Sequence, residues 1–252
     1  MMPRRRRRSA ASGQTPAEDP RKRASSGRQF RRLGDVLLIA GGLILSYPFW
    51  SAGYAQVQQT RLDSAYRDAS SQFAAVNATA QRAPDDEIIR RSAAAYGKGL
   101  ERGDAIGRLR IPRIALDRLV QQGVSGPAAL DPDSDRSLLR SGPVHYAVTP
   151  LPGAGEPFAV AGHRTTYGAP FYKLDRVRAG DEILVETPYA RFRYAVVKKT
   201  VVEPADVSVL LDRGYGLVLT TCTPPYSASH RLIVWASLEA STPRRGASSP
   251  GR

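Results

Sequence analysis

The chain contains one cysteine, Cys222, which lies in the sequence LTTCTPP. A lone thiol cannot form a disulfide within the chain, so it is either a buried structural side chain or a reactive one. A cysteine becomes a nucleophile when a nearby base or positive charge favours the thiolate. Arg231, nine positions further along, can supply that charge. The sequence context favours Cys222 as a nucleophile.

The base for this thiol has to come from three histidines: His145, His163 and His230. His163 closes an apolar run and Cys222 closes another, so both are expected at strand ends. If the strands that flank the loop after Cys222 pair antiparallel, Arg231 becomes the neighbour of the cysteine. Its guanidinium can pair with a thiolate and stabilise the oxyanion that forms when a peptide carbonyl is attacked. We therefore predict that thiol, imidazole and guanidinium share one pocket.

The remaining polar residues near these positions receive simpler interpretations. His145 is expected in a loop or strand near the site, His230 is expected to face solvent, and Arg164 is expected to form a structural ion pair. Two interpretations stay open for three more side chains, which either line a substrate groove or satisfy local hydrogen bonds: Thr220, Thr221 and Tyr167. Acidic residues are not clustered in a way that demands a metal, and we expect no metal or cofactor.

The elements that position these residues begin near Ile106, where short runs of Val, Ile, Leu and Tyr alternate with Gly, Pro and Asp. Eight short strands are expected, at 106–111, 113–120, 158–161, 182–186, 191–197, 199–202, 216–221 and 231–236, with a short helix at 204–211. Short strands with close turn signals predict a closed or nearly closed β-barrel and not alternating β/α units.

The segments before and after this region differ in composition. Residues 1–32 hold eleven Lys and Arg against two acids, so nine of the fourteen net positive charges lie there. This location argues against nucleic-acid binding and predicts a disordered basic tail. Residues 33–54 contain one charged residue, which predicts a transmembrane helix with the N-terminus in the cytoplasm. A cleaved signal peptide is the alternative. We expect a helical stalk and linker at 55–105, a catalytic domain at 106–238 and a disordered tail at 239–252.

These motifs carry a family resemblance. The stretch Leu219–Cys222 with Arg231, together with the upstream Ala161–Thr165, resembles the signature of sortases, which are membrane-anchored cysteine transpeptidases of Gram-positive bacteria. The sequences of 163–171 and 227–234 resemble the class E sortases of actinobacteria. The resemblance covers residues 106–238, and the expected anchor and stalk agree with the family layout.

The resemblance implies an eight-stranded sortase barrel that lies outside the cell. It implies Cys222 as the nucleophile, His163 as the general acid and base, and Arg231 as the residue that contacts the substrate carbonyl. The expected substrates are secreted proteins with a C-terminal Leu-Pro-x-Thr-Gly-like signal, Leu-Ala-x-Thr-Gly in this group. The bond after Thr would be cleaved through a thioester. The acyl group would then pass to an amine of a cell-wall precursor such as lipid II, without any metal.

Two alternatives and one departure accompany this interpretation. The chain could polymerise pilins, with a pilin lysine as the amine. Another extracytoplasmic cysteine acyltransferase, such as an L,D-transpeptidase, fits less well, because no Ser-His-Gly-Cys-like stretch is present. Class E relatives often have a histidine directly after the cysteine, where this chain has Thr223. We expect catalysis to survive this departure, because the base is assigned to His163.

Overall fold

The structure, a computed structural model, describes residues 20–79, 83–125 and 134–245. Of the tails expected at 1–32 and 239–252, residues 1–19 and 246–252 lie outside the described residues. Two compact units, residues 1–47 and 48–252, are described separately. The long helix α1, Pro20–Thr79, belongs to both units and begins inside the segment for which we expected disorder.

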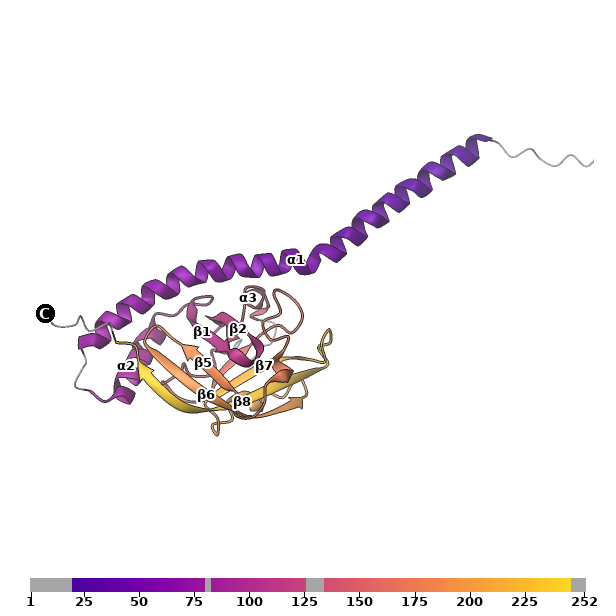
Figure 1. The fold of residues 1–252 in the computed structure, drawn as a ribbon. Coiled ribbons are helices and arrows are strands. Elements are labelled where there is room, and N and C mark those ends of the chain that lie inside the picture. The colour runs from indigo at the N-terminus through magenta and orange to yellow at the C-terminus, as the bar shows by residue number, and fades with distance from the viewer. Residues whose placement is uncertain (1–19, 80–82, 126–133, 246–252) are drawn as a thin grey trace, which may run out of the picture. The chain divides into compact units, whose positions relative to one another are not determined.

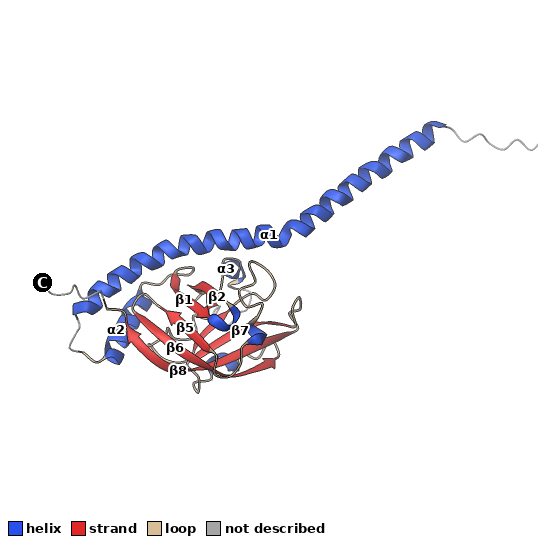
Figure 2. Cartoon of the chain, viewed as in Figure 1, coloured by secondary structure: helices blue, strands red, loops and turns tan. Residues whose placement is uncertain are grey.

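The second unit contains a closed barrel, and its strands are shown in red in Figure 2. Among the described residues the barrel has eight strands in the order β1-β2-β3-β4-β7-β8-β6-β5, and β5 pairs with β1 to close it. The strands are β1 Ala105–Ile111, β2 Leu116–Gln122, β3 Val144–His145, β4 Phe158–Ala161, β5 Glu182–Glu186, β6 Ala190–Val202, β7 Leu217–Thr223 and β8 His230–Pro243. The expected eight-stranded barrel with short helices is confirmed.

The strand boundaries differ from the expected ones at four places. The strand expected at 113–120 begins only at Leu116, because Pro112–Ile114 form a 3₁₀ turn. The two strands expected at 191–197 and 199–202 form one strand, β6, because the chain passes a register shift between Val196 and Lys198 and continues its pairing with β8. Strand β3 was not expected, since two residues are too few to show a period of two. Strand β8 runs on to Pro243, into the segment expected to be disordered.

The barrel is filled by apolar side chains. Strand β5 alternates, with Ile183 and Val185 buried between the more exposed Glu182 and Glu186. Burying a side chain such as Ile183 contributes about 1.5–3 kcal/mol. The largest fully buried side chains include Phe158, Phe171, Phe192, Leu109, Leu217 and Leu219. Because β4 and β7 contribute Phe158, Leu217 and Leu219 to this core, the packing also fixes where these two strands end.

Short helices connect and cover the strands. They are α2 Asp85–Lys98, α3 Arg136–Leu139 and the 3₁₀ turns η1 Pro112–Ile114, η3 Leu174–Arg176 and η4 Ser208–Leu211. The turn η4 lies inside the short helix expected at 204–211. Helix α2 begins directly after Pro84 and buries Ile88 and Ile89.

The N-terminal part of α1 is long and apolar enough to cross a membrane, a property that a signal sequence near an N-terminus shares. In the first unit the large apolar side chains of residues 33–45 are exposed. Exposed apolar side chains over such a length are costly in water. This segment therefore has the composition of a membrane anchor.

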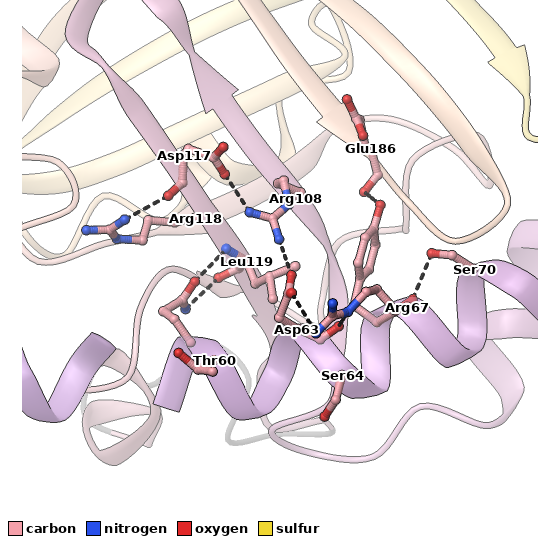
Figure 3. A network of polar contacts seen from close by, with 12 residues as sticks. Thr60, Asp63, Ser64, Arg67, Ser70, Arg108, Asp117, Arg118, Leu119 and Glu186 are labelled. Atoms are coloured by element: carbon pink, nitrogen blue, oxygen red, sulfur yellow. Dashed lines mark hydrogen bonds and ion pairs between the residues drawn. The ribbon is translucent and has the colours of Figure 1, made fainter. Parts of the chain in front are cut away.

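The later part of α1 lies against the barrel, in the segment where we expected a stalk (Figure 1). Figure 3 shows the polar contacts that hold it. Asp63 of the helix pairs with Arg108 of β1, whose guanidinium also lies 2.8 Å from Asp117 of β2. The Tyr66 hydroxyl donates to the carbonyl of Glu186 at 3.0 Å. Residues 48–79 are therefore part of the second compact unit.

Candidate active site

Cys222 and Arg231 are direct neighbours on the paired strands β7 and β8. The two strands run antiparallel, with Cys222 opposite Arg231 and Thr223 opposite His230. The cysteine is free and half-buried. One terminal nitrogen of Arg231 donates to the carbonyls of Ala228 at 3.0 Å and His230 at 3.2 Å, which fixes the guanidinium at the base of the β7–β8 turn. The antiparallel pairing expected from the sequence is confirmed.

His163 reaches the same rim of the barrel through strand β4. Strands β4 and β7 are parallel, with Ala161 opposite Thr220. The pairing continues past the end of β4, because the Gly162 amide donates to the Thr220 carbonyl at 3.1 Å. Two further steps in this register bring His163 level with Cys222. The ends of three bonded strands thus carry an imidazole, a thiol and a guanidinium in that order.

The ring of His163 lies in a confined setting. It stacks on the ring of Tyr167, with the ring centroids 5.5 Å apart. Its Nε2 atom is buried and has no hydrogen-bond partner among the described residues. Burial lowers the pKa of His163, and the positive charges of Arg140 and Arg136 lower it further. A neutral imidazole with a free nitrogen can accept a proton from a thiol.

The two threonines before the cysteine are buried and hydrogen-bonded. The Thr221 hydroxyl donates to the Gly162 carbonyl at 2.8 Å and so fixes the residue that precedes His163. The Thr220 hydroxyl lies 3.1 Å from the hydroxyl of Tyr146. Of the two interpretations of Thr220 and Thr221, these contacts favour local hydrogen bonding. Tyr167, with φ +51°, lies against the His163 ring.

Tyr146 is a residue of this site that sequence reasoning missed. Burial raises the pKa of its phenol, and the hydrogen bond to Thr220 and the charge of Arg231 oppose that rise. The Cys222 charge acts on the same phenol, so Tyr146 lies within electrostatic range of both residues. No signal in the sequence marks it, because it follows a strand of only two residues.

The other polar residues have structural contacts. His230 is exposed, and its Nε2 lies 3.4 Å from a carboxylate oxygen of Glu203. Arg164 is buried and lies 2.9 Å from Asp175, so the expected ion pair is confirmed. No group of three or more His, Cys, Asp and Glu side chains that could hold a metal occurs in the part of the chain that the structure describes.

His145 is a buried histidine with both ring nitrogens occupied. Its Nδ1 lies 2.9 Å from Gln122 Oε1 and its Nε2 lies 3.0 Å from Thr149 Oγ1, while the ring packs on Phe158. Burial lowers its pKa from 6.5 to about 3. Both nitrogens are taken, which leaves no atom to exchange a proton with substrate.

This buried histidine predicts acid sensitivity of the fold. Below pH 6.5 the unfolded chain binds a proton at His145 and the folded chain does not, so stability is lost as the pH falls toward 3. Between pH 7 and 5 the parent should lose about 2 kcal/mol more unfolding free energy than a His145→Gln variant. Urea unfolding at both pH values measures this difference. Equal losses in the two proteins would contradict the prediction.

Comparison with known proteins agrees with this geometry. The family model of the Sortase domain matches residues 109–239, more than half of the chain. The protein therefore belongs to the sortase family.

Similar curated relatives carry the class E name, as the sequence motifs suggested. Sortase SrtE1 of Streptomyces coelicolor is 28% identical over 230 residues, which is 85% of this chain and 58% of SrtE1. Sortase SrtE2 of the same organism is 29% identical over 82% of this chain and 80% of SrtE2. The chain thus spans little more than half the length of SrtE1.

Solved structures support the fold. The SrtF sortase from Corynebacterium diphtheriae superposes with a TM-score of 0.51 at 26% identity, over 60% of this chain and 93% of that one. The Clostridium perfringens Sortase D5 transpeptidase gives a TM-score of 0.50 at 25% identity, over 60% and 88% of the two chains. The barrel of the second unit is therefore a sortase barrel.

Proposed function

We propose that the chain is a cysteine transpeptidase that cleaves a Leu-Pro-x-Thr-Gly-like sorting signal, Leu-Ala-x-Thr-Gly in the class E group, between Thr and Gly. The observation that carries the proposal is the meeting of His163, Cys222 and Arg231 at the ends of three bonded strands. Membership of the sortase family, which includes a protein named as a transpeptidase, supports it. The catalytic domain is assigned to residues 106–238.

The proposed reaction has two halves that use the same three side chains. In the first, His163 takes the proton of the thiol and the Cys222 sulfur attacks the Thr carbonyl carbon, while Arg231 stabilises the oxyanion. The tetrahedral species collapses, the Thr–Gly bond breaks, and His163 returns the proton to the leaving Gly amine. In the second, an incoming amine attacks the thioester and loses its proton to His163. The sulfur leaves as a thiolate and takes this proton back from His163.

The proposed place of this reaction is the outer surface of the cell membrane. The apolar part of α1 would anchor the chain as a single span, with the arginine-rich N-terminus in the cytoplasm and residues from about 55 onward outside. The proposed substrates are secreted proteins with C-terminal sorting signals, and the proposed acceptor is lipid II or another amine. No nucleic acid takes part, because most of the excess charge lies in the N-terminal tail.

The full chain in detergent, supplied with a Leu-Ala-x-Thr-Gly peptide and triglycine, tests the proposal. We expect cleavage between Thr and Gly and a new peptide bond from Thr to triglycine, both seen by mass spectrometry. A pilin lysine peptide used in place of triglycine tests for polymerising activity. Cleavage at another bond, or of a peptidoglycan tetrapeptide and not of the sorting peptide, would contradict the proposal.

A further inference from the structure

The docked segment of α1, residues 48–79, meets the barrel through buried polar side chains as well as through apolar ones. The buried positions of this segment include Ala55, Gln59, Tyr66, Ser70 and Asn77, which follow one face of the helix. The side-chain amide of Asn77 donates to the carbonyls of Tyr189 and Arg244, both at 3.1 Å. Buried polar groups that bond to backbone atoms fix the rotation and register of a helix more narrowly than apolar contacts do.

Gln59 makes the most specific of these contacts. Its Oε1 accepts from the Leu119 amide at 2.7 Å, and its Nε2 donates to the Leu119 carbonyl at 3.1 Å and to the Ser141 carbonyl at 3.0 Å. Strand β2 pairs with β3 only at Gln121 and Gln122. At Leu119 no residue of β3 lies opposite, and the backbone amide and carbonyl of Leu119 bond to the Gln59 side chain in place of a neighbouring strand. A primary amide offers the acceptor and two donors that this position requires.

The contacts of Gln59 lead toward the His163 ring. Ser141 directly follows Arg140, whose guanidinium carbon lies 5.7 Å from the centre of the Tyr167 ring, and the Tyr167 ring stacks on His163. Gly142, with φ +155°, has a backbone conformation that L side chains rarely adopt, and a Cβ at this position would press on the Gln59 amide. Through the bond from Gln59 to Ser141, the helix therefore holds the segment that carries Arg140.

The helix also passes near the loop that holds Tyr167. A Cβ placed on Gly168 would lie 3.8 Å from the Cβ of Ala55, one turn before Gln59. Ala55 is buried, as is Ser51 another turn earlier. The helix thus bonds to the segment before β3 and lies near the segment after β4, the two segments that flank the aromatic stack.

We propose that the docked segment of α1 positions the base of the active site, and that Gln59 is the positioning residue through which it acts. The helix holds the Arg140 segment, Arg140 lies over Tyr167, and Tyr167 stacks on the His163 ring, which the strand register places level with Cys222. The inference rests on the proposed function for the role of His163. By this inference, the part of α1 that follows the apolar segment helps to set the position of His163 in the reaction.

The charged and titratable groups around His163 determine how readily its imidazole is protonated, so the test follows a property that depends on this protonation. Helix α3 and its C-terminal residue contribute Arg136 and Arg140, the His163 loop contributes Tyr167, and by register β7 and β8 contribute Cys222 and Arg231. If the segment that carries Arg140 is held less firmly, the His163 ring lies further from the positive charge of Arg140 and becomes more hydrated. The imidazole then protonates more readily, and its positive charge favours the thiolate.

The test compares Gln59→Leu with Gln56→Leu, which makes the same change at an exposed position of the same helix. The readout is the pH midpoint for alkylation of Cys222 by iodoacetamide in the full chain in detergent, where the only thiol reports directly. We expect Gln59→Leu to move the midpoint to lower pH by more than about half a unit, and Gln56→Leu to leave it unchanged. Transfer to triglycine should fall about tenfold in kcat with a small change in KM.

Three results would overturn the inference or separate it from the proposed function. A Gln59→Leu protein that melts earlier but keeps the parental midpoint and kcat would make the contact merely structural. If Gln59→Leu does not fold, Arg140→Gln, which leaves the Gln59 contacts in place, must shift the midpoint, and an unchanged midpoint overturns the inference. A parent that transfers no peptide would refute the proposed function, while the alkylation midpoint would still decide the role of Gln59.

Discussion

Replacing Cys222 by alanine is expected to abolish peptide transfer, with a loss of at least about 10³-fold in kcat. The chain has no second thiol that could form the thioester. Neither the imidazole nor the guanidinium of the site can replace the sulfur as the atom that carries the acyl group. The rate of peptide transfer to triglycine by the full chain checks this expectation. The enzyme concentration has to be high enough for a rate about 10³-fold below the parental one to be detected.

A Cys222→Ser variant is the matched control for the fold. It keeps a side chain of similar size at the end of β7 but has a hydroxyl whose proton is far harder to remove, so it should also be inactive while melting at the parental temperature. Transfer by either variant at a rate near the parental one would refute the assignment of Cys222 as the nucleophile.

Replacing His163 by alanine is expected to lower kcat by about 10²–10⁴-fold. The variant loses both the proton acceptor for the thiol and the donor for the leaving amine. The pH dependence of kcat should also change, because the acid limb that reflects protonation of His163 disappears. In the parent that limb should lie below the ordinary value for histidine, 6.5, because burial, Arg140 and Arg136 lower the His163 pKa. The measurement is a pH–rate profile of both proteins.

His230→Ala supplies the control for this second prediction. His230 is exposed, lies opposite Thr223 in the register and contacts Glu203, so its loss should change kcat by less than about twofold. A parental rate in His163→Ala, or an equal loss in His230→Ala, would show that the base is misassigned.

Much of the site could be predicted because its chemistry depends on strand ends. Cys222 and His163 each close an apolar run, and Arg231 opens the next one, so the sequence itself indicated that they meet at one rim. The antiparallel pairing of Cys222 with Arg231 required only a short loop between two strands. The general outline of the barrel followed in the same way, from turn residues between runs of β-branched side chains.

The docking of α1 could not be predicted, because its contact face mixes apolar side chains such as Leu62 and Phe73 with buried polar ones. Two of its apolar residues, Val57 and Val76, are exposed. The helix instead buries Gln59 and Asn77, whose value lies in hydrogen bonds to backbone atoms of the barrel. In the sequence, Gln59 cannot be distinguished from an exposed glutamine, because its partner is the backbone of a strand that lies sixty residues away.

Tyr146 and strand β3 were missed for a related reason. A strand of two residues has no periodicity, and the phenol acquires its environment only when β7 brings Thr220 beside it. Contacts between residues far apart in the chain, with no repeating pattern on either side, leave no trace in composition or spacing.

The central claim is that Cys222, activated at this rim, carries the acyl group of the substrate. Mass spectrometry of the acid-quenched full chain, incubated with a Leu-Ala-x-Thr-Gly peptide without an amine, tests it most directly. The account predicts an adduct on Cys222 with the mass of the peptide up to Thr, which disappears when triglycine is added. Cleavage of the peptide while Cys222 remains unmodified, or an adduct on any other residue, would contradict it.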